Sequence, residues 1–160
     1  MNFRSHISKV GQIVEARRCR KRVQIRTRAD LVSNTKKQPG LYWIETNMPA
    51  SDITEAVKKC SGKTKNVRKT KPQGIGITRS VSGYQIIYSG TESDIQKRLL
   101  EHLFNEGADS TEKMSLQIDK PPFAQYDWYI SCVHIKDYST RYALEAWWRL
   151  NIGWPPFCKR

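Results

Sequence analysis

The segment Tyr88-Ser89-Gly90-Thr91-Glu92-Ser93-Asp94-Ile95 marks the point where a predicted strand gives way to a predicted helix. Residues 81–88 are rich in branched and aromatic side chains around a Ser-Gly turn, and with residues 74–78 they predict a hairpin. Thr91 or Ser93 can cap the helix that follows, which is the clearest helix of the sequence. Its apolar side chains recur on one face at helical spacing: Ile95, Leu99, Leu100, Leu103 and Phe104.

Two polar side chains of this helix indicate chemistry. Arg98 and His102 are four residues apart, so they lie on one stripe of the helix beside Ile95 and Leu99. A guanidinium can hold two phosphate oxygens at once, and an imidazole can position or relay a proton. The pair therefore indicates an anion site, although the same spacing is also common on solvated helix faces.

The rest of the sequence predicts a mixed order of helices and strands. Pro39-Gly40 is a turn signal before a core strand at 41–44, and residues 51–60 have the spacing of a short helix. Residues 61–73 are almost all polar or basic, which is typical of a loop. The remaining expectations are a helix starting at Ser5, a strand at 23–28, a loop at 108–122, a strand at 126–133, and a helix opened by Ser139 or Thr140 and stopped at Gly153.

Length and composition limit the kind of protein. A chain of 160 residues predicts one domain, 1–160, around one core. The sequence lacks a long apolar run and an apolar leader, so we expect a cytoplasmic protein that does not enter a membrane. The cysteines are far apart and lack metal-ligand spacing, which favours free thiols: Cys19, Cys60, Cys132 and Cys158.

The net charge of +13 is concentrated in two segments. Residues 1–39 contain 11 Lys and Arg against 2 acidic residues, and residues 58–79 contain 8 against none, while the rest of the chain is mildly acidic. Segregated positive charge favours contact with a polyanion, because phosphate contacts release bound counterions. Nucleic acid is the first partner to expect, and a solvated basic surface or arm is the alternative.

Three further residues have both a structural and a chemical interpretation. Glu145 stands among the aromatic residues of the last predicted helix, where a carboxylate needs a partner. That partner can be Arg149, four residues further on, or a hard cation such as Mg²⁺. Tyr42 and Tyr88 lie in predicted strands, where half-buried packing is the ordinary role of tyrosine.

The order of these residues resembles that of the GIY-YIG nucleases. Gly40-Leu41-Tyr42 is similar to the first signature of that family, and Tyr88-Ser89-Gly90 is similar to the second. Arg98 and His102 follow at the expected spacing, and Glu145 follows in a late helix. Each tripeptide alone is unspecific, whereas the ordered set is much more specific.

The resemblance covers residues 40–46 and 84–158, and it has three departures. Leu41 and Ser89 replace the isoleucines of the two signatures, and the gap between the two tyrosines is long. The long gap is more similar to restriction endonucleases than to compact homing endonucleases. Residues 1–39 would then be a basic N-terminal extension and residues 47–83 a basic insertion.

A further oddity lies near the C-terminus. Restriction-type members tend to carry an asparagine after a proline-containing segment, whereas this chain has Trp154-Pro155-Pro156-Phe157-Cys158. Asn151 is the nearest asparagine, so both Asn151 and Cys158 remain candidates for that position.

The resemblance implies an α+β fold with a small, mainly antiparallel three-stranded sheet flanked by helices. It implies metal-dependent cleavage of DNA, with Glu145 holding one Mg²⁺ or Mn²⁺ and Arg98 holding the scissile phosphate. Tyr42, assisted by His102, would activate or orient the attacking water, and Tyr88 would complete the hydrogen-bonded network. A tyrosine has an ordinary pKa near 10, so this use requires a lowered pKa.

Double-stranded DNA is the expected partner, and a sequence-specific type II restriction enzyme is the leading expectation. A double-strand cut at a palindrome would require two active sites, and hence a homodimer or pairing on DNA. The alternatives are a non-catalytic nucleic-acid-binding protein and a nicking, repair or toxin nuclease. The residues expected to contact DNA are Arg17, Arg18, Arg20, Arg22, Arg26, Arg28, Lys65, Arg68, Lys69 and Lys71.

Overall fold

The computed structural model describes residues 2–67 and 71–159, apart from the side chain of Ser110. The helices are α1 (Phe3–Arg20), α2 (Arg28–Asn34), α3 (Ala50–Ser61), α4 (Ile95–Phe104) and α5 (Tyr138–Asn151), with short 3-10 turns at Asp109–Thr111 and Phe123–Gln125. The strands are β1 (Val23–Gln24), β2 (Gly40–Thr46), β3 (Gln85–Glu92) and β4 (Trp128–His134). None of the helices described is long and apolar enough to cross a lipid bilayer.

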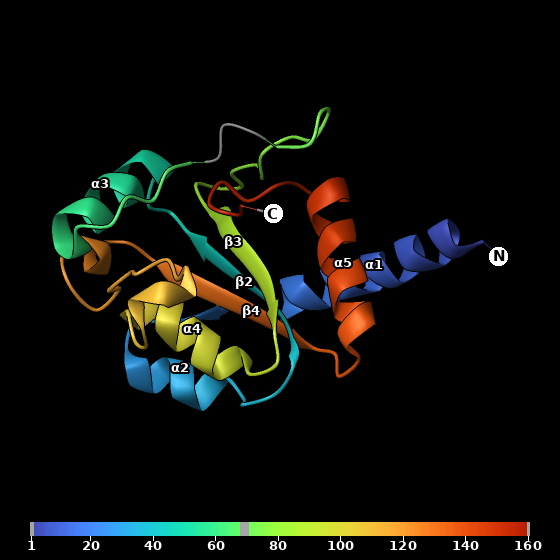
Figure 1. The fold of residues 1–160 in the computed structure, drawn as a ribbon, viewed down its shortest axis with the longest axis horizontal. Helices are drawn as coiled ribbons and strands as arrows, with labels where there is room; N and C mark the ends of the chain where they lie inside the picture. Colours follow the sequence, from blue (N-terminus) through green and yellow to red (C-terminus); the bar gives the residue numbers. More distant parts are fainter. Residues whose placement is uncertain (1, 68–70, 160) are drawn as a thin grey trace.

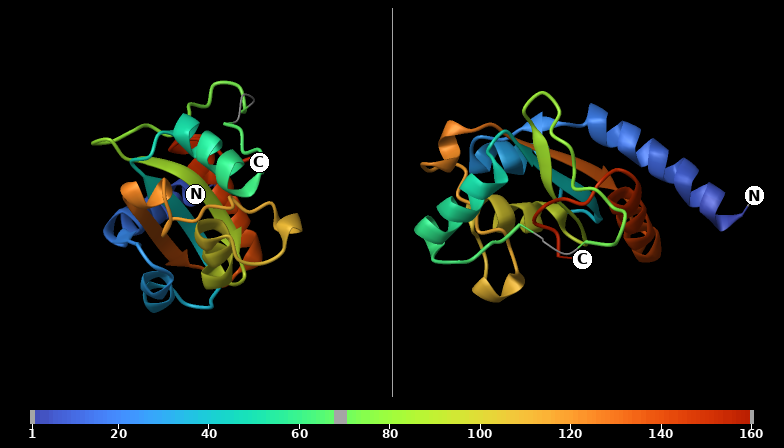
Figure 2. Two further views of the ribbon diagram at one scale, coloured as in Figure 1. Left: turned by 90° about the vertical axis from the view of Figure 1, so that its left-hand side faces the viewer. Right: turned by 90° about the horizontal axis from the view of Figure 1, so that it is seen from above.

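The strands form an antiparallel sheet in the order β1-β4-β2-β3, so β1 and β3 are its edges. Helices α1 and α5 lie together on one face of the sheet, and α2, α3 and α4 lie on the other (Figures 1 and 2). The expected α+β fold with an antiparallel sheet flanked by helices is confirmed. The sheet has four strands where three were expected, because the two-residue strand β1 pairs with β4.

Each face of the sheet supports its own core, because side chains alternate along a strand. On β2, Leu41 and Trp43 pack in the cluster under α1 and α5, which includes Trp148. Tyr42 and Ile44 point to the opposite face and join the larger cluster under α2, α3 and α4. The central strand is therefore buried on both sides, and the side of Tyr42 carries the candidate site.

A β-bulge changes this alternation on β3. Ile44 pairs with Tyr88 and Glu45 pairs with Ile86, so Ile87 is an extra residue without a partner in the register with β2. Ile87 and Tyr88 consequently both pack on the α4 side, while Ser89 bonds to α5 on the opposite face. Bulges commonly re-aim a side chain next to an active site, and this one aims Tyr88 at the helix that carries His102.

The N-terminal part of the chain differs from the sequence prediction. Helix α1 continues through the basic run as far as Arg20, and the strand expected at 23–28 is only Val23–Gln24. The reason is a capping box: Thr27 Oγ1 accepts the Asp30 amide hydrogen, and the Asp30 carboxylate accepts that of Thr27. This box starts α2 at Arg28, where the alternating side chains had indicated a strand.

The hairpin expected from residues 74–78 and 81–88 forms only at its Ser-Gly turn. Ile77 forms only an isolated bridge with Trp154, and Val81 bridges Tyr84 around a turn in which Ser82 and Gly83 have positive φ. Strand β3 begins after that turn and pairs with β2 instead. Residues 81–84 form this turn, so they are not part of β3.

The caps of α4 and α5 are aspartates close to the residues that the sequence suggested. Asp94 caps α4 by accepting the Lys97 amide hydrogen, because Thr91 is still paired with Leu41 in the sheet. Asp137 caps α5 in the same way, ahead of Ser139 and Thr140. All four cysteines are free, as expected.

Candidate active site

The two signature glycines are required by close approaches of the backbone. A Cβ atom on Gly90 would lie 2.4 Å from Tyr42 Oη, because the Tyr42 ring crosses directly over this residue. A Cβ atom on Gly40 would lie 2.3 Å from the Val133 carbonyl oxygen on the neighbouring strand. Each tripeptide therefore has a physical reason for its glycine, and the second glycine makes room for the first tyrosine.

Tyr42, Tyr88 and His102 form one aromatic cluster on the α4 side of the sheet. Tyr42 Oη lies 3.0 Å from His102 Nε2. The Tyr88 ring lies 4.5 Å from the His102 ring and 6.3 Å from the Tyr42 ring, centroid to centroid. Three residues from β2, β3 and α4 thus meet as the sequence predicted.

The hydrogen bonds of His102 determine its tautomer. The backbone N–H of Met114 donates to His102 Nδ1 at 3.0 Å, so this nitrogen carries no proton. The proton of the neutral ring therefore lies on Nε2, which donates to Tyr42 Oη. Burial, together with the positive charges of Arg98 and Lys65, holds the pKa of His102 well below its usual value. His102 is a neutral hydrogen-bond donor to Tyr42, and it is not placed to take the Tyr42 proton.

Neither tyrosine has the lowered pKa that a catalytic base requires. Tyr42 is only 2% exposed, and burial raises its pKa well above the usual value although the nearby Arg98 guanidinium acts in the opposite direction. Burial raises the pKa of Tyr88 to about 12, against the lowering effect of Arg98 and Arg149. Both hydroxyls stay protonated at neutral pH in the protein without substrate.

Arg98 lies next to this cluster and is already partly neutralised. Its Nη1 atom lies 2.7 Å from Glu101 Oε2, one helical turn away, and its side chain is largely buried. The charges of Arg98, Arg149 and Glu145 all act on the Tyr88 hydroxyl. Tyr88 is thus the point at which the α4 and α5 parts of the candidate site converge.

Glu145 forms an ion pair with Arg149, which was the structural interpretation of its spacing. Burial raises the pKa of Glu145, and the Arg149 guanidinium only partly opposes this. Arg149 in turn donates from Nε to Ser89 Oγ at 3.0 Å and from Nη2 to the Ser89 carbonyl oxygen at 2.6 Å. The carboxylate is therefore tied through Arg149 to the second signature.

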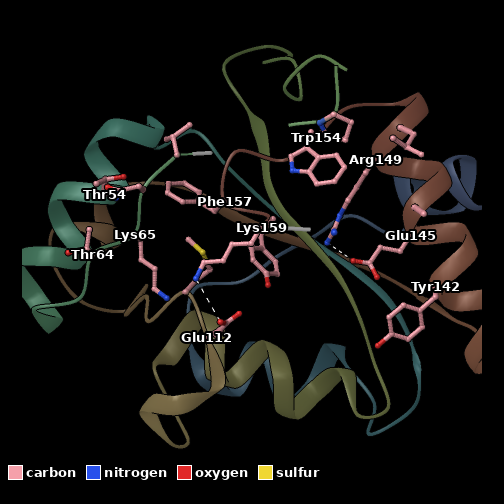
Figure 3. A pocket seen from close by; sticks show the side chains of 17 residues that line it. Thr54, Thr64, Lys65, Glu112, Tyr142, Glu145, Arg149, Trp154, Phe157 and Lys159 are labelled. Atoms are coloured by element: carbon pink, nitrogen blue, oxygen red, sulfur yellow. Dashed lines mark ion pairs between the residues drawn. The ribbon is translucent and has the colours of Figure 1, made fainter. Parts of the chain in front are cut away.

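A cleft of about 1260 Å³ opens beside this network (Figure 3). Tyr88 and Glu145 line it, and so does Lys65 from the chain after α3. Within the described part of the chain, the residues lining it do not include Tyr42, Arg98 or His102. These three form a buried layer next to Tyr88, so Tyr88 is the tyrosine that a ligand in the cleft would touch.

Of the described residues, three basic and two acidic side chains line the cleft: Lys65, Arg149, Lys159, Glu112 and Glu145. Burial lowers the pKa of Lys65, and the neighbouring charges of Lys159 and Lys63 lower it further. Lys159 Nζ lies 3.9 Å from Glu112 Oε1, and both residues line the cleft. Arg149 and Lys159 are paired with Glu145 and Glu112, so an anionic ligand would gain most from Lys65, which is repelled by Lys159 and Lys63.

The basic residues expected to contact DNA fall into different settings. Arg18, Arg22 and Arg28 form ion pairs with Glu15, Glu45 and Glu106. Arg18 is buried and Lys65 is half-buried, whereas Arg68 and Lys69 lie outside the described residues. The exposed members of the set are Arg17, Arg20, Arg22, Arg26, Arg28 and Lys71. The basic N-terminal segment leads into β1, and the loop that carries Lys65 lines the cleft beside β3. Because β1 and β3 are the two edges of the sheet, the two basic segments lie near opposite edges.

The sequence did not reveal the buried network around Ser89. Cys158 Sγ lies 3.3 Å from both the Ser89 amide nitrogen and its carbonyl oxygen, and Trp154 Nε1 donates to the Cys158 carbonyl oxygen at 2.9 Å. Together with Arg149, these residues hold the C-terminal segment against β3. The signal was the serine in place of isoleucine, since a buried hydroxyl needs a partner.

Among the residues described, no three His, Cys, Asp or Glu side chains are grouped as a metal site. Glu145 is therefore a single candidate ligand. Comparison of the chain with protein-family models, with curated proteins and with solved structures finds no match in any of the three.

Proposed function

We propose that this protein is a metal-dependent DNA endonuclease with a GIY-YIG-like active site. The observation that carries the proposal is the contact of Tyr42, Tyr88 and His102, far apart in the sequence, beside a cleft that Glu145 and Lys65 line. The charge of +13 favours a polyanionic substrate. Sequence-specific restriction is the leading role within this class.

The donor atoms present fit a hard divalent cation. Mg²⁺ is commonly held by one or two carboxylates and completes its shell with water and substrate phosphate, so a single glutamate suffices. The ion pair with Arg149 uses Oε1 of Glu145, so a cation at this carboxylate would bind next to the Arg149 guanidinium. Bound there, Mg²⁺ or Mn²⁺ would neutralise phosphoryl charge and help the 3′ oxygen to leave.

The protein's own groups would position the reactants. The Tyr88 hydroxyl lines the cleft and can orient a water molecule by hydrogen bonding, while its pKa of about 12 makes it a poor base. His102 and Tyr42 would fix the Tyr88 ring from behind by packing and by their shared hydrogen bond. Arg98 lies behind Tyr88 and does not line the cleft, so it would reach a phosphate oxygen only by exchanging its contact with Glu101 and turning toward the cleft.

Incubation of supercoiled plasmid with the purified protein tests this function. We expect cleavage with Mg²⁺ or Mn²⁺ and none with EDTA. Glu145→Ala and Arg98→Ala should abolish cleavage while DNA binding in a gel-shift assay is mostly kept. Glu112→Ala, which removes another carboxylate of the cleft, is the matched control and should still cut. Full activity of either active-site variant would refute the assignment.

The products separate the roles within the nuclease class. Discrete fragments with defined ends support a restriction enzyme. Nicked circles or a smear support a nicking, repair or toxin nuclease.

A non-catalytic nucleic-acid-binding protein is the second candidate. It is favoured by the ion pair that already neutralises Glu145 and by the raised pKa values of both tyrosines. Such a protein would shift plasmid in a gel and leave it uncut under every metal condition.

A further inference from the structure

Helix α5 carries two neighbouring exposed tyrosines, of which Tyr142 lines the cleft. Tyr138 is 64% exposed and Tyr142 is 49% exposed. Four residues apart, they share one stripe of the helix, and their ring centroids are 4.6 Å apart. Tyr142 lines the cleft one helical turn before Glu145 (Figure 3).

Packing of the core does not account for this pair. The buried face of α5 is formed by Leu144 and Trp148, which join the cluster under α1. The stripe of Tyr142 continues instead through Ala146 and Leu150, both of which line the cleft. Large apolar surfaces that stay exposed along a cleft are typical of ligand-binding sites.

The chemistry of the cleft identifies the kind of ligand. Lys65 offers positive charge on the wall opposite α5, where it can meet a phosphate (Figure 3). Aromatic rings beside cations are how proteins bind single-stranded nucleic acid, because bases stack on the rings and the backbone follows the charge. The bases of an intact duplex cannot stack in this way, since neighbouring base pairs cover both of their faces. A surface for duplex alone would need the cations and not the exposed rings.

We propose that Tyr138 and Tyr142 form a stacking platform for unpaired bases, so that the cleft takes DNA that is single-stranded on one side of the cut. A flap or a splayed junction has this form and a continuous duplex does not, so this inference favours a nicking or repair nuclease over a sequence-specific restriction enzyme. The inference rests on the proposed nuclease function for its placement next to the scissile phosphate. The platform itself binds DNA without metal and can be tested separately.

The test compares the wild type with two variants of Tyr142 in EDTA, where no cleavage occurs. Tyr142→Phe keeps the ring, and Tyr142→Leu keeps apolar bulk without a ring. Fluorescence anisotropy measures binding to three oligonucleotides of equal length: a duplex, a single strand, and a duplex with a single-stranded flap. Loss of one stacked base should weaken binding of the flap roughly 5- to 150-fold for Tyr142→Leu. Tyr142→Phe should bind like the wild type, and binding of the duplex should not change.

A second readout reports the stacking directly. The fluorescence of 2-aminopurine at the first unpaired position should be quenched by the wild type and by Tyr142→Phe, but not by Tyr142→Leu. Because both tyrosines are exposed, the variants should have the circular dichroism spectrum and melting temperature of the wild type. If Tyr142→Leu does not fold, Tyr138→Leu takes its place.

The outcomes distinguish the two proposals. Equal affinity of the wild type for duplex and flap, or equal losses on both, would overturn the stacking platform even if plasmid is cut. Absence of cleavage with Mg²⁺ on every substrate, together with ring-dependent binding of the flap, would overturn the nuclease and leave the platform standing.

Discussion

Replacing Arg149 by methionine should destabilise the protein, because it leaves the buried Glu145 carboxylate without its ion-pair partner. The Arg149 and Glu145 side chains are 9% and 14% exposed, and Arg149 also donates two hydrogen bonds to Ser89. Breaking a fully buried pair costs about 3–5 kcal/mol, because one charge stays buried alone. Since some water reaches this pair, we expect Arg149→Met to lower the free energy of unfolding by about 2–4 kcal/mol.

The double variant Glu145→Gln with Arg149→Met removes both charges. It distinguishes the effect of the ion pair from the effect of lost packing. Its loss of stability should be smaller than the sum of the two single losses by at least about 1 kcal/mol. Urea denaturation at neutral pH measures all four proteins, with equal m-values as the check that the unfolding transition is the same.

The pH dependence of Arg149→Met gives an independent check. Burial alone then acts on Glu145, so the pKa of this carboxylate in the folded protein lies above its value in the unfolded chain. The folded state therefore prefers the protonated form, and the loss of stability is present at neutral pH and shrinks as the pH falls toward 4. Additive single losses, or a loss that does not change with pH, would refute this account of Glu145.

Two further outcomes follow from the aromatic cluster. Gly90→Ala places a methyl group against Tyr42 Oη, so it should lower the free energy of unfolding by about 1–3 kcal/mol and remove most of the cleavage activity. Gly76→Ala is the control and should change neither property, because nothing lies within 4 Å of that position. Equal melting temperatures of the two variants would contradict this packing. Because the pKa of His102 is lowered in the folded protein, His102 takes up a proton near pH 6.5 in the unfolded chain and stays neutral in the folded one. The free energy of unfolding should therefore decrease as the pH falls below 6.5. His102→Gln should flatten this part of the stability profile in urea titrations, and an unchanged profile would contradict the neutral tautomer.

Most of the fold followed from local patterns in the sequence. The alternating and branched residues of β2 and β4 and the apolar stripes of α4 and α5 predicted elements close to those observed, because each pattern matches the period of its structure. Helix α2 was missed because the alternation at 23–28 outweighed the short capping box of Thr27 and Asp30. The bulge at Ile87 was also missed, since it depends on pairing with a strand distant in sequence.

The contact of three candidate residues was predictable from the sequence, whereas their chemistry was not. The order of the signature residues predicted that Tyr42, Tyr88 and His102 would meet, and they do. Their protonation depends on burial and on the amide of Met114, which no spacing reveals. Tertiary contacts therefore assign His102 as a donor and make Tyr88, rather than Tyr42, the tyrosine of the cleft.

The central claim is that one divalent cation binds at Glu145, beside Tyr88 and in the cleft that takes the DNA. Anomalous diffraction from crystals of a Tyr88→Phe variant with Mn²⁺ and a DNA oligonucleotide tests it most directly. We expect one manganese peak within about 2.0–2.3 Å of a Glu145 carboxylate oxygen and of a phosphate oxygen. A peak at another site, or DNA bound in the cleft with its phosphates away from Glu145 and no manganese, would contradict the claim.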